Sequence, residues 1–227
     1  MMKIKLNKGR IFFTSDTHYG HTNICRGVSN WRDENGNVPI HQTRDFETLE
    51  QMNDKIVESI NSVVGEDDTL FHLGDWSFGG FDNIEILRNR IVCKNIHLVF
   101  GNHDHFLINN KNSIQDLFSS AQQYLELEII IPSEYKNVKH SKYNFILNHY
   151  PIVSWNMMND GAIHLHGHTH LPYNLKLMPG RGMDCGIDGN INFQPYSLEE
   201  ILKLINSRPI KSMFVFDHHV ERFRVTP

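Results

Sequence analysis

Three short apolar segments of this chain each end at a polar side chain that can bind a metal ion. The segments are residues 11–16, 69–75 and 96–102, and their last residues are an aspartate, an aspartate and an asparagine. Their length and apolar character predict buried β-strands. If the strands are parallel, their carboxyl ends line one crevice at the edge of a sheet. The pattern therefore favours a fold in which that edge carries several metal-binding side chains.

The stretches between these segments predict helices. Apolar residues recur every three or four positions over residues 46–63, which indicates an amphipathic helix of about five turns whose apolar side faces the sheet. A second helix over residues 83–91 joins the second and third strands. The order strand-helix-strand-helix-strand implies parallel strands with right-handed crossover connections.

The second half of the chain has a different pattern. It contains four further strand candidates with little helix between them, at residues 125–131, 143–147, 163–166 and 213–216. A helix is predicted over residues 198–205, after a turn at Pro195. A second, more antiparallel sheet stacked on the first fits this order best. We expect a single domain over residues 1–227, because a chain of this length can bury one sizeable core.

Charge and composition limit the classes of partner. The chain has a formal net charge of −4, and charged residues make up 21% of it. Tight binding along a nucleic acid requires a basic face that displaces counterions, so no extended nucleic-acid binding is expected. A small phosphorylated substrate is compatible with this charge, because bound metal ions can supply a local positive field.

The N-terminus and the cysteines indicate the compartment. Residues 1–7 lack the apolar run of a secretory signal, and no later segment is long enough to span a bilayer. Cys25, Cys93 and Cys185 are far apart in the sequence and form no Cys-x-x-Cys pair. Neither a disulfide framework nor a thiolate zinc site is therefore expected. We expect a cytoplasmic protein without a membrane partner, and the sequence leaves its oligomeric state open.

Histidines gather near the predicted strand ends. Asp16 and His18 are two residues apart, as are His168 and His170, and side chains at this spacing project from the same side of an extended segment. A single Asp-x-His pair is weak evidence, because a capping aspartate followed by an exposed histidine is common. Together with His149 and the polar strand ends, however, the two pairs favour one shared metal site.

These segments resemble a known set of motifs. In chain order they are similar to the five signature blocks of the calcineurin-like metallophosphoesterase superfamily: Asp16-x-His18, Gly74-Asp75, Gly101-Asn102-His103-Asp104, His149 and Gly167-His168-x-His170. Residues 14–21 and 148–156 further resemble a small bacterial and phage phosphoesterase branch of it. The resemblance implies an α/β (α+β) fold, namely a four-layer α/β/β/α sandwich of two stacked mixed β-sheets flanked by helices.

The resemblance also implies a ligand set for two divalent metal ions. One ion would be bound by Asp16, His18, Asp75 and His170, and the other by Asp75, Asn102, His149 and His168. Asp75 would bridge the two ions. Carboxylate, imidazole and amide oxygen ligands suit Mn²⁺, which we favour, and also Fe, Zn or Ni.

The reaction that the resemblance implies is hydrolysis of a phosphate ester. A hydroxide held between the metals would attack phosphorus in line with the leaving oxygen. Two divalent ions bring more positive charge than the two carboxylates remove, so the site attracts a phosphate. In the family, the histidine of the Gly-Asn-His block contacts the phosphate and helps the leaving group depart, and His103 matches that position. His21, in the branch-specific segment, is a further candidate for phosphate contact.

A small phosphodiester or nucleotide is the favoured substrate, and three alternatives stay open. A phosphomonoester would use the same site. A nuclease is a second alternative, although the acidic balance of the chain argues against it. A non-catalytic metal-binding module is the third, but a decayed site should have lost one or more ligands, and the set here is complete.

Several nearby residues receive supporting roles. His164 and His166 lie on the same predicted strand as the last histidine pair but farther from the metals, so they are interpreted as packed residues or as supports for the ligands. Asp104 either orients a neighbouring group or caps the following helix. Asp188 precedes a turn-forming glycine and is interpreted as structural. Gly167 is expected to let the backbone turn.

Overall fold

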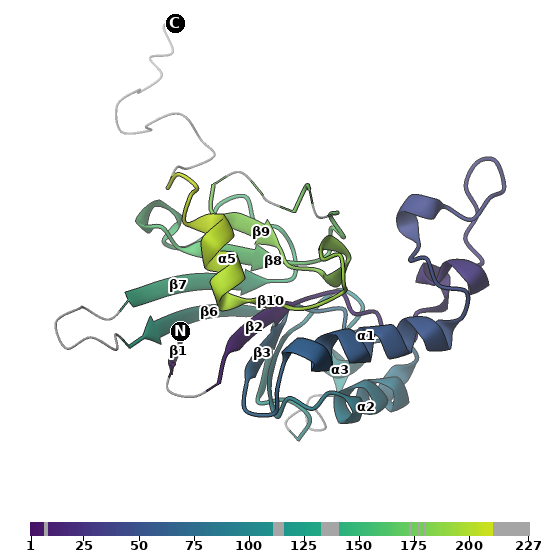
Figure 1. Cartoon of the computed structure of the whole chain (residues 1–227), viewed down its shortest axis with the longest axis horizontal. Helices are drawn as coiled ribbons and strands as arrows, with labels where there is room; N and C mark the ends of the chain where they lie inside the picture. The colour runs from purple at the N-terminus through teal and green to yellow at the C-terminus, as the bar shows by residue number, and fades with distance from the viewer. Residues whose placement is uncertain are drawn as a thin grey trace, which may run out of the picture.

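Two five-stranded β-sheets pack face to face in this protein, with helices beside them (Figure 1). The structure is a computed structural model that describes residues 1–6, 9–110, 116–132, 141–172, 174–176, 178 and 180–210. The strand order is β10-β2-β3-β4-β5 in the first sheet and β1-β6-β7-β8-β9 in the second. Each sheet contains parallel and antiparallel pairs. The expected sandwich of two stacked mixed sheets is therefore confirmed.

The first sheet contains the three strands that the apolar segments predict. Its members are β2 (Ile11–Thr14), β3 (Thr69–His72), β4 (Asn95–Val99), β5 (Ser120–Gln122) and β10 (Tyr196–Ser197). Strands β2 to β5 are parallel, and β10 pairs antiparallel with β2. The carboxyl ends of the three predicted strands therefore meet at one edge of the sheet.

Two helices, α1 (Leu49–Val63) and α2 (Gly80–Arg90), connect the parallel strands. α1 is shorter than the predicted helix over residues 46–63, because a capping box starts it later. The hydroxyl of Thr48 accepts a hydrogen bond from the backbone N–H of Gln51, and the Gln51 side chain accepts one from the backbone N–H of Thr48. Such a reciprocal cap satisfies two N–H groups that the first turn leaves unpaired.

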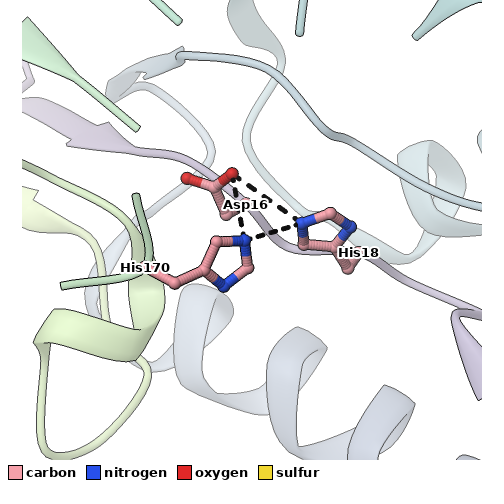
Figure 2. A group of neighbouring side chains, drawn as sticks. All are labelled: Asp16, His18 and His170. Atoms are coloured by element: carbon pink, nitrogen blue, oxygen red, sulfur yellow. Dashed lines mark hydrogen bonds and ion pairs between the residues drawn. The ribbon is translucent and has the colours of Figure 1, made fainter. Parts of the chain in front are cut away.

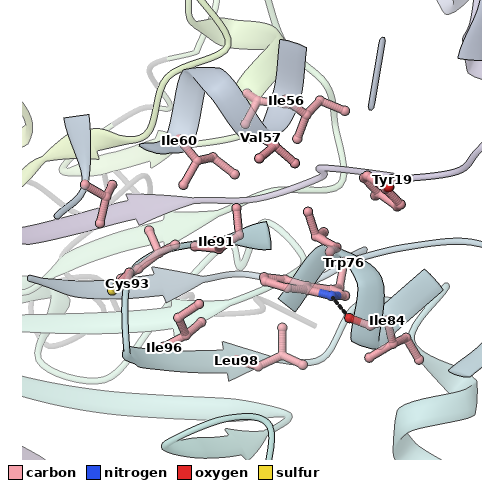
Figure 3. Close-up of a cluster of buried hydrophobic side chains, with 14 of the residues drawn as sticks. Tyr19, Ile56, Val57, Ile60, Trp76, Ile84, Ile91, Cys93, Ile96 and Leu98 are labelled. Carbon is pink, nitrogen blue, oxygen red and sulfur yellow. Dashed lines mark hydrogen bonds between the residues drawn. The ribbon is translucent and has the colours of Figure 1, made fainter. Parts of the chain in front are cut away.

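The apolar sides of α1 and α2 form a core with the outer face of the first sheet (Figure 3). Ile56 and Ile60 of α1 and Ile96 of β4 are fully buried there. Trp76 lies in the same cluster, and its indole N–H donates a hydrogen bond to the carbonyl of Ile84 at 3.3 Å. Each buried side chain of this size stabilises the fold by about 1.5–3 kcal/mol. This core fixes the helices on the sheet, and with them the loops at its carboxyl edge.

The second sheet differs from the more antiparallel sheet that we expected. Its strands are β1 (Met2–Lys5), β6 (Tyr124–Ile131), β7 (Ser141–Asn148), β8 (Ile163–His166) and β9 (Gly182–Asp184). β6 and β7 are antiparallel, but the other three pairs are parallel. A parallel pair requires a connection of roughly a dozen residues or more. Residues 149–162 and 167–181 are long enough for such connections, so the scarcity of predicted helix did not imply hairpins.

The inner faces of the two sheets share a second core. The ring of Phe13 in β2 lies 5.3 Å from that of Phe71 in β3 and 5.4 Å from that of Phe145 in β7, measured between centroids. Helix α5 (Leu198–Ile205) occupies its predicted position and buries Ile201 and Ile205 in this core. A buried apolar cluster therefore joins the inner faces of the two sheets.

The remaining elements are short. They are α3 (His105–Asn109) and the 3₁₀ helices η1 (Thr22–Ile24), η2 (Arg26–Val28), η3 (Ile40–Gln42), η4 (Met158–Asp160) and η5 (Ile187–Gly189). Around η4, Trp155, Met158 and Ala162 cover Ile146 on the outer face of the second sheet. The strand predicted at residues 213–216 lies outside the described residues. Among the helices that the structure describes, none has the length and apolar character needed to cross a bilayer.

Candidate metal centre

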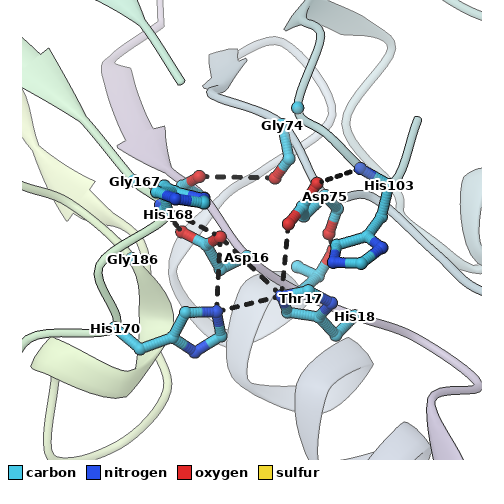
Figure 4. Close-up of polar contacts among 12 residues, drawn as sticks. Asp16, Thr17, His18, Gly74, Asp75, His103, Gly167, His168, His170 and Gly186 are labelled. Carbon is cyan, nitrogen blue, oxygen red and sulfur yellow. Dashed lines mark hydrogen bonds and ion pairs between the residues drawn. The ribbon is translucent and has the colours of Figure 1, made fainter. Parts of the chain in front are cut away.

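The predicted site residues meet where the carboxyl edge of the first sheet adjoins the second sheet (Figure 4). The loops after β2 and β3 run side by side, because the N–H of Asp16 donates to the carbonyl of Gly74 at 2.9 Å. The segments after β7 and β8 are joined in the same way, by the N–H of Gly167 and the carbonyl of His149 at 2.9 Å. The N–H of His168 then donates to the Asp16 carboxylate at 2.9 Å, which links the two sheets.

Asp16, His18 and His170 form one group of candidate ligands (Figure 2). His170 Nε2 lies 3.5 Å from Asp16 Oδ1 and 3.0 Å from His18 Nε2. His18 Nε2 lies 3.7 Å from Asp16 Oδ1. The three donor atoms lie within 4.8 Å of one another, so they can contact one cation.

Asp16, Asp75 and His149 form a second group, so Asp16 belongs to both groups. Asp75 Oδ2 lies 3.6 Å from His149 Nε2 and 3.5 Å from His18 Nε2, so one oxygen faces both groups. Asn102 Oδ1 lies 2.9 Å from His149 Nε2 and 2.9 Å from His168 Nδ1. The structure thus brings all seven predicted ligands into one cluster.

Five of these seven residues have a left-handed backbone. Their φ angles are 58° at Asp16, 49° at His18, 56° at Asp75, 68° at His168 and 46° at His170. This conformation costs about 1–3 kcal/mol per residue other than glycine, and it is concentrated at functional sites. The expectation that each Asp-x-His or His-x-His pair is extended is therefore wrong. Left-handed turns, and not strand alternation, direct both members of each pair to the site.

Gly167 is required by a close approach between the two sheets. A Cβ atom at this position would lie 2.0 Å from Ser15 Oγ and 2.3 Å from Asp16 Oδ2. Its backbone is not left-handed, so a positive φ angle is not what requires glycine at this position. The absence of a side chain instead lets the loop after β8 reach the Asp16 carboxylate.

Burial sets the charge of the candidate ligands. It raises the pKa of Asp16 to about 8 and also raises the pKa of Asp75. It lowers the pKa of His149 to about 4 and holds the pKa of His18 well below its usual value. Both imidazoles are therefore neutral near pH 7, which is the form that binds metals. A nearby cation favours the ionised form of a buried carboxylate, so this donor set fits divalent metal ions.

Asp104 orients the loop that carries Asp75. Its Oδ2 accepts hydrogen bonds at 2.8 Å from the backbone N–H groups of Asp75 and Gly101. Its Oδ1 accepts one from the N–H of Trp76 at 3.0 Å. Asp104 also stands at the N-cap of α3, but its side chain makes no capping hydrogen bond there. Of its two predicted roles, orientation is therefore confirmed and capping is wrong.

Asp188 touches a candidate ligand, so its interpretation as merely structural is incomplete. Its Oδ2 lies 2.7 Å from His170 Nδ1, and its two oxygens accept hydrogen bonds from the guanidinium of Arg44. Burial raises the pKa of Asp188, but Arg44 and His170 together outweigh burial and hold this pKa well below its ordinary value. Burial lowers the pKa of His170, but Asp188 and Asp16 outweigh it and raise this pKa. Sequence reasoning missed Arg44, which lies in a segment without a recognisable pattern.

A pocket of about 800 Å³ adjoins the cluster. His18 and His170 border it on one side, and residues 41–45 and Phe193 line it elsewhere. His103 also lines the pocket, with its ring centroid 5.6 Å from that of His18. The predicted catalytic histidine therefore lies between the candidate ligands and the space that a substrate can fill.

His21 and Trp31 form another part of the pocket wall. The His21 ring stacks on Phe78 with centroids 3.7 Å apart and meets the Trp31 ring edge-on at 5.7 Å. Burial lowers the pKa of His21 to about 4, so this imidazole is neutral near pH 7. Its Nδ1 is buried without a hydrogen-bond partner. Trp31 was not singled out from the sequence, because its neighbours show no periodic pattern.

The two histidines of β8 support the fold around the cluster. His164 accepts a hydrogen bond from the N–H of Ile152 at 3.0 Å and donates one to the carbonyl of Ile146 at 3.0 Å. His166 donates through Nδ1 to the carbonyl of Gly167 at 2.8 Å. Both side chains are buried and bond to backbone groups, in agreement with their predicted supporting roles, although His166 Nε2 is buried without a hydrogen-bond partner.

The chain is similar to several known proteins. A family model described as calcineurin-like phosphoesterase matches residues 9–172. The uncharacterized protein MJ1445 of Methanocaldococcus jannaschii is 27% identical over 86% of this chain and 91% of its own length. The Gene 66 protein of Mycobacterium phage D29 is 27% identical over 86% of this chain and 96% of its own length. A crystal structure of a protein of unknown function from Aquifex aeolicus shares the fold, with a TM-score of 0.57, 22% identity, and coverage of 87% of this chain and 100% of that one.

Proposed function

The chain belongs to the calcineurin-like phosphoesterase family, and from this premise we propose that it is a dinuclear metal-dependent phosphoesterase acting on a small phosphodiester or nucleotide. The position of Asp75 carries the proposal. One of its oxygens lies 3.5 Å from His18 Nε2 and 3.6 Å from His149 Nε2. A carboxylate oxygen between two ligand groups suits a pair of cations that share one ligand.

The family resemblance divides the donor set between two cations. One would be held by Asp16, His18, His170 and Asp75, and the other by Asp75, His149, Asn102 and His168. When bound, two divalent cations, with Mn²⁺ favoured, supply activation of a water molecule and stabilise charge on the phosphoryl oxygens. Carboxylate, imidazole and amide oxygen donors suit these metals.

Protein side chains at the pocket would act on the substrate directly. His103 is held beside the cluster, because its backbone N–H donates to Asp75 Oδ1 at 2.8 Å. From there its imidazole can contact the phosphate and give a proton to the departing oxygen, which is general acid catalysis. His21 lines the pocket and its imidazole is neutral near pH 7, so the ring would offer a neutral contact to a phosphate oxygen.

The pocket favours a small ester with a planar organic group. Its volume of about 800 Å³ is within the usual range for small-molecule sites. Trp31 provides a flat apolar wall, as aromatic rings do in such clefts. Arg44, the arginine that lines the pocket, is committed to Asp188 and to backbone carbonyls, so it is not free to bind a second phosphate. These features support a substrate with a single phosphoryl group and an uncharged organic group.

Turnover of two chromogenic esters tests the proposal. With added Mn²⁺, we expect bis(p-nitrophenyl) phosphate to be hydrolysed with a higher kcat/KM than p-nitrophenyl phosphate. A strong preference for the monoester would make the protein a phosphomonoesterase. Salt-sensitive binding and cleavage of a DNA or RNA oligomer would favour a nuclease, and no turnover of any phosphate ester would favour a non-catalytic module.

Replacing His103 with glutamine should lower kcat by about 10²- to 10⁴-fold, the usual contribution of a positioned acid or base. Bound manganese should stay at the wild-type level, because the side chain is not among the proposed ligands. Elemental analysis and steady-state kinetics measure both quantities. His105→Gln is the matched control. His105 is exposed and lies two residues away in the sequence, so its replacement should change neither kcat nor metal content. Loss of bound metal from His103→Gln would instead make His103 a ligand.

Replacing Trp31 with alanine should raise KM for bis(p-nitrophenyl) phosphate about 10-fold, which corresponds to loss of roughly 1.4 kcal/mol of ring contact. The inhibition constant of inorganic phosphate should not change, because phosphate would occupy the metal centre and not the aromatic wall. Trp31→Phe keeps a ring and should recover most of the wild-type KM. Equal weakening of phosphate and diester binding would show that Trp31 supports the centre itself.

A further inference from the structure

Arg44 is a buried arginine that holds the backbone of the metal-binding loop. Its side chain is 3% exposed. Nη1 donates to the carbonyl of Thr17 at 2.8 Å, and Nη2 donates to the carbonyl of Asp16 at 2.6 Å. These contacts fix the two residues that precede His18.

The same guanidinium forms a two-pronged ion pair with Asp188. Nε donates to Asp188 Oδ1 at 2.8 Å, and Nη2 donates to Asp188 Oδ2 at 2.8 Å. Asp188 Oδ2 also lies 2.7 Å from His170 Nδ1. A carboxylate paired with arginine accepts hydrogen bonds and does not donate them, so the proton between Asp188 and His170 belongs to Nδ1.

This hydrogen bond determines which nitrogen of His170 is available to a metal ion. With the proton on Nδ1, the lone pair of the neutral ring is on Nε2. Nε2 is the atom that lies 3.5 Å from Asp16 Oδ1 and 3.0 Å from His18 Nε2, inside the first group of candidate ligands. Carboxylates commonly orient metal-binding histidines in this way.

Arg44 also connects this arrangement to the pocket wall. Its backbone N–H donates to the carbonyl of Ile24 at 2.6 Å, and its carbonyl accepts from the N–H of Arg26 at 3.0 Å. These bonds join the two ends of the segment that carries Trp31. One residue therefore ties that part of the pocket wall to the backbone of the metal-binding loop.

We propose that Arg44 and Asp188 are positioning residues that hold His170 with Nε2 directed into the first cation site. The proposal rests on the proposed function, because it assigns these two residues a role in binding one of its two metal ions. If this salt bridge only anchored the loop, replacing one of its residues in a variant that stays folded would change neither the protonated nitrogen of His170 nor the metal affinity.

Calorimetric titration of metal-free protein with Mn²⁺ tests the role in binding. We expect Asp188→Asn to weaken the affinity for one of the two ions about 10- to 100-fold, the usual effect of removing an outer partner of a ligand. Arg44→Lys keeps the positive charge but loses the two-pronged guanidinium geometry, so it should weaken the affinity for the same ion by a smaller factor. Asp54→Asn is the matched control, because Asp54 pairs with Arg90 at 2.6 Å outside the cluster and should leave both affinities unchanged.

Nuclear magnetic resonance of the metal-free protein tests the orientation directly. In long-range ¹H–¹⁵N spectra, assigned with His170→Gln and recorded above the raised pKa of His170 so that the ring is neutral, wild-type His170 should carry its proton on Nδ1. Asp188→Asn should show a mixture of tautomers. Wild-type affinities for both ions in Asp188→Asn, or a wild-type His170 protonated on Nε2, would overturn the proposal. Failure of the wild-type protein to bind Mn²⁺ would contradict the proposed function itself, and the tautomer measurement separates the two cases.

Discussion

Replacing Asp75 with asparagine should remove catalysis and reduce the amount of bound metal. The carboxylate oxygen between His18 and His149 is the proposed shared ligand, and a neutral amide cannot hold two cations in the same way. Metal ions contribute several kcal/mol to charge stabilisation, so kcat should fall by about 10³-fold or more. Elemental analysis should show fewer than two manganese ions per chain, against two in the wild-type protein.

The asparagine variant should still fold. Its side chain has the shape of aspartate, and its carbonyl oxygen can accept the hydrogen bond that the N–H of His103 gives to Asp75 Oδ1 at 2.8 Å. Asp82→Asn is a matched control, because Asp82 is exposed in the first turn of α2 and should change neither metal content nor kcat. A folded Asp75→Asn protein with both ions and normal turnover would contradict the two-metal proposal.

Much of the cluster was predictable because its residue types follow a simple topological rule. Apolar strands that are followed two or three residues later by Asp16, Asp75 and Asn102 place those side chains near one edge whenever the strands are parallel. The helix pattern between the strands implies that they are parallel. Runs of apolar residues indicate which segments are buried, and short buried segments form the strands of the sheet. The edge of the sheet at which a polar residue lies can therefore be predicted from sequence, although the strands themselves end two or three residues earlier.

The local backbone of the cluster could not be predicted in the same way. Strand periodicity suggested that His168 and His170 continue β8, whereas β8 ends at His166 and both later residues have positive φ angles. Left-handed conformations of histidine are imposed by surrounding contacts, and no local sequence signal marks them. Similarly, the pairing of Arg44 with Asp188 joins residues far apart in the chain, so neither position alone indicates it.

Replacing Gly167 with alanine should destabilise the protein by about 3 kcal/mol or more, the upper part of the range for overpacked sites. The added Cβ would lie 2.0 Å from Ser15 Oγ and 2.3 Å from Asp16 Oδ2. Both of these residues are fully buried, so neither side chain has space to move away. For a protein of this size, each kcal/mol lowers the melting temperature by roughly 2–4 °C, so a decrease of about 6 °C or more is expected in thermal unfolding.

The same substitution should also reach the metal centre. Relief of the clash requires the loop after β8 to withdraw from Asp16, which would move His168 and His170 away from the other ligands. Gly65→Ala is the control: its Cβ would meet only Asp68 Oδ2 at 3.5 Å, an ordinary contact, so the melting temperature should hardly change. The prediction would be contradicted if Gly167→Ala had the same melting temperature as Gly65→Ala and bound two manganese ions. The ligands would then assemble without the close contact between the two sheets.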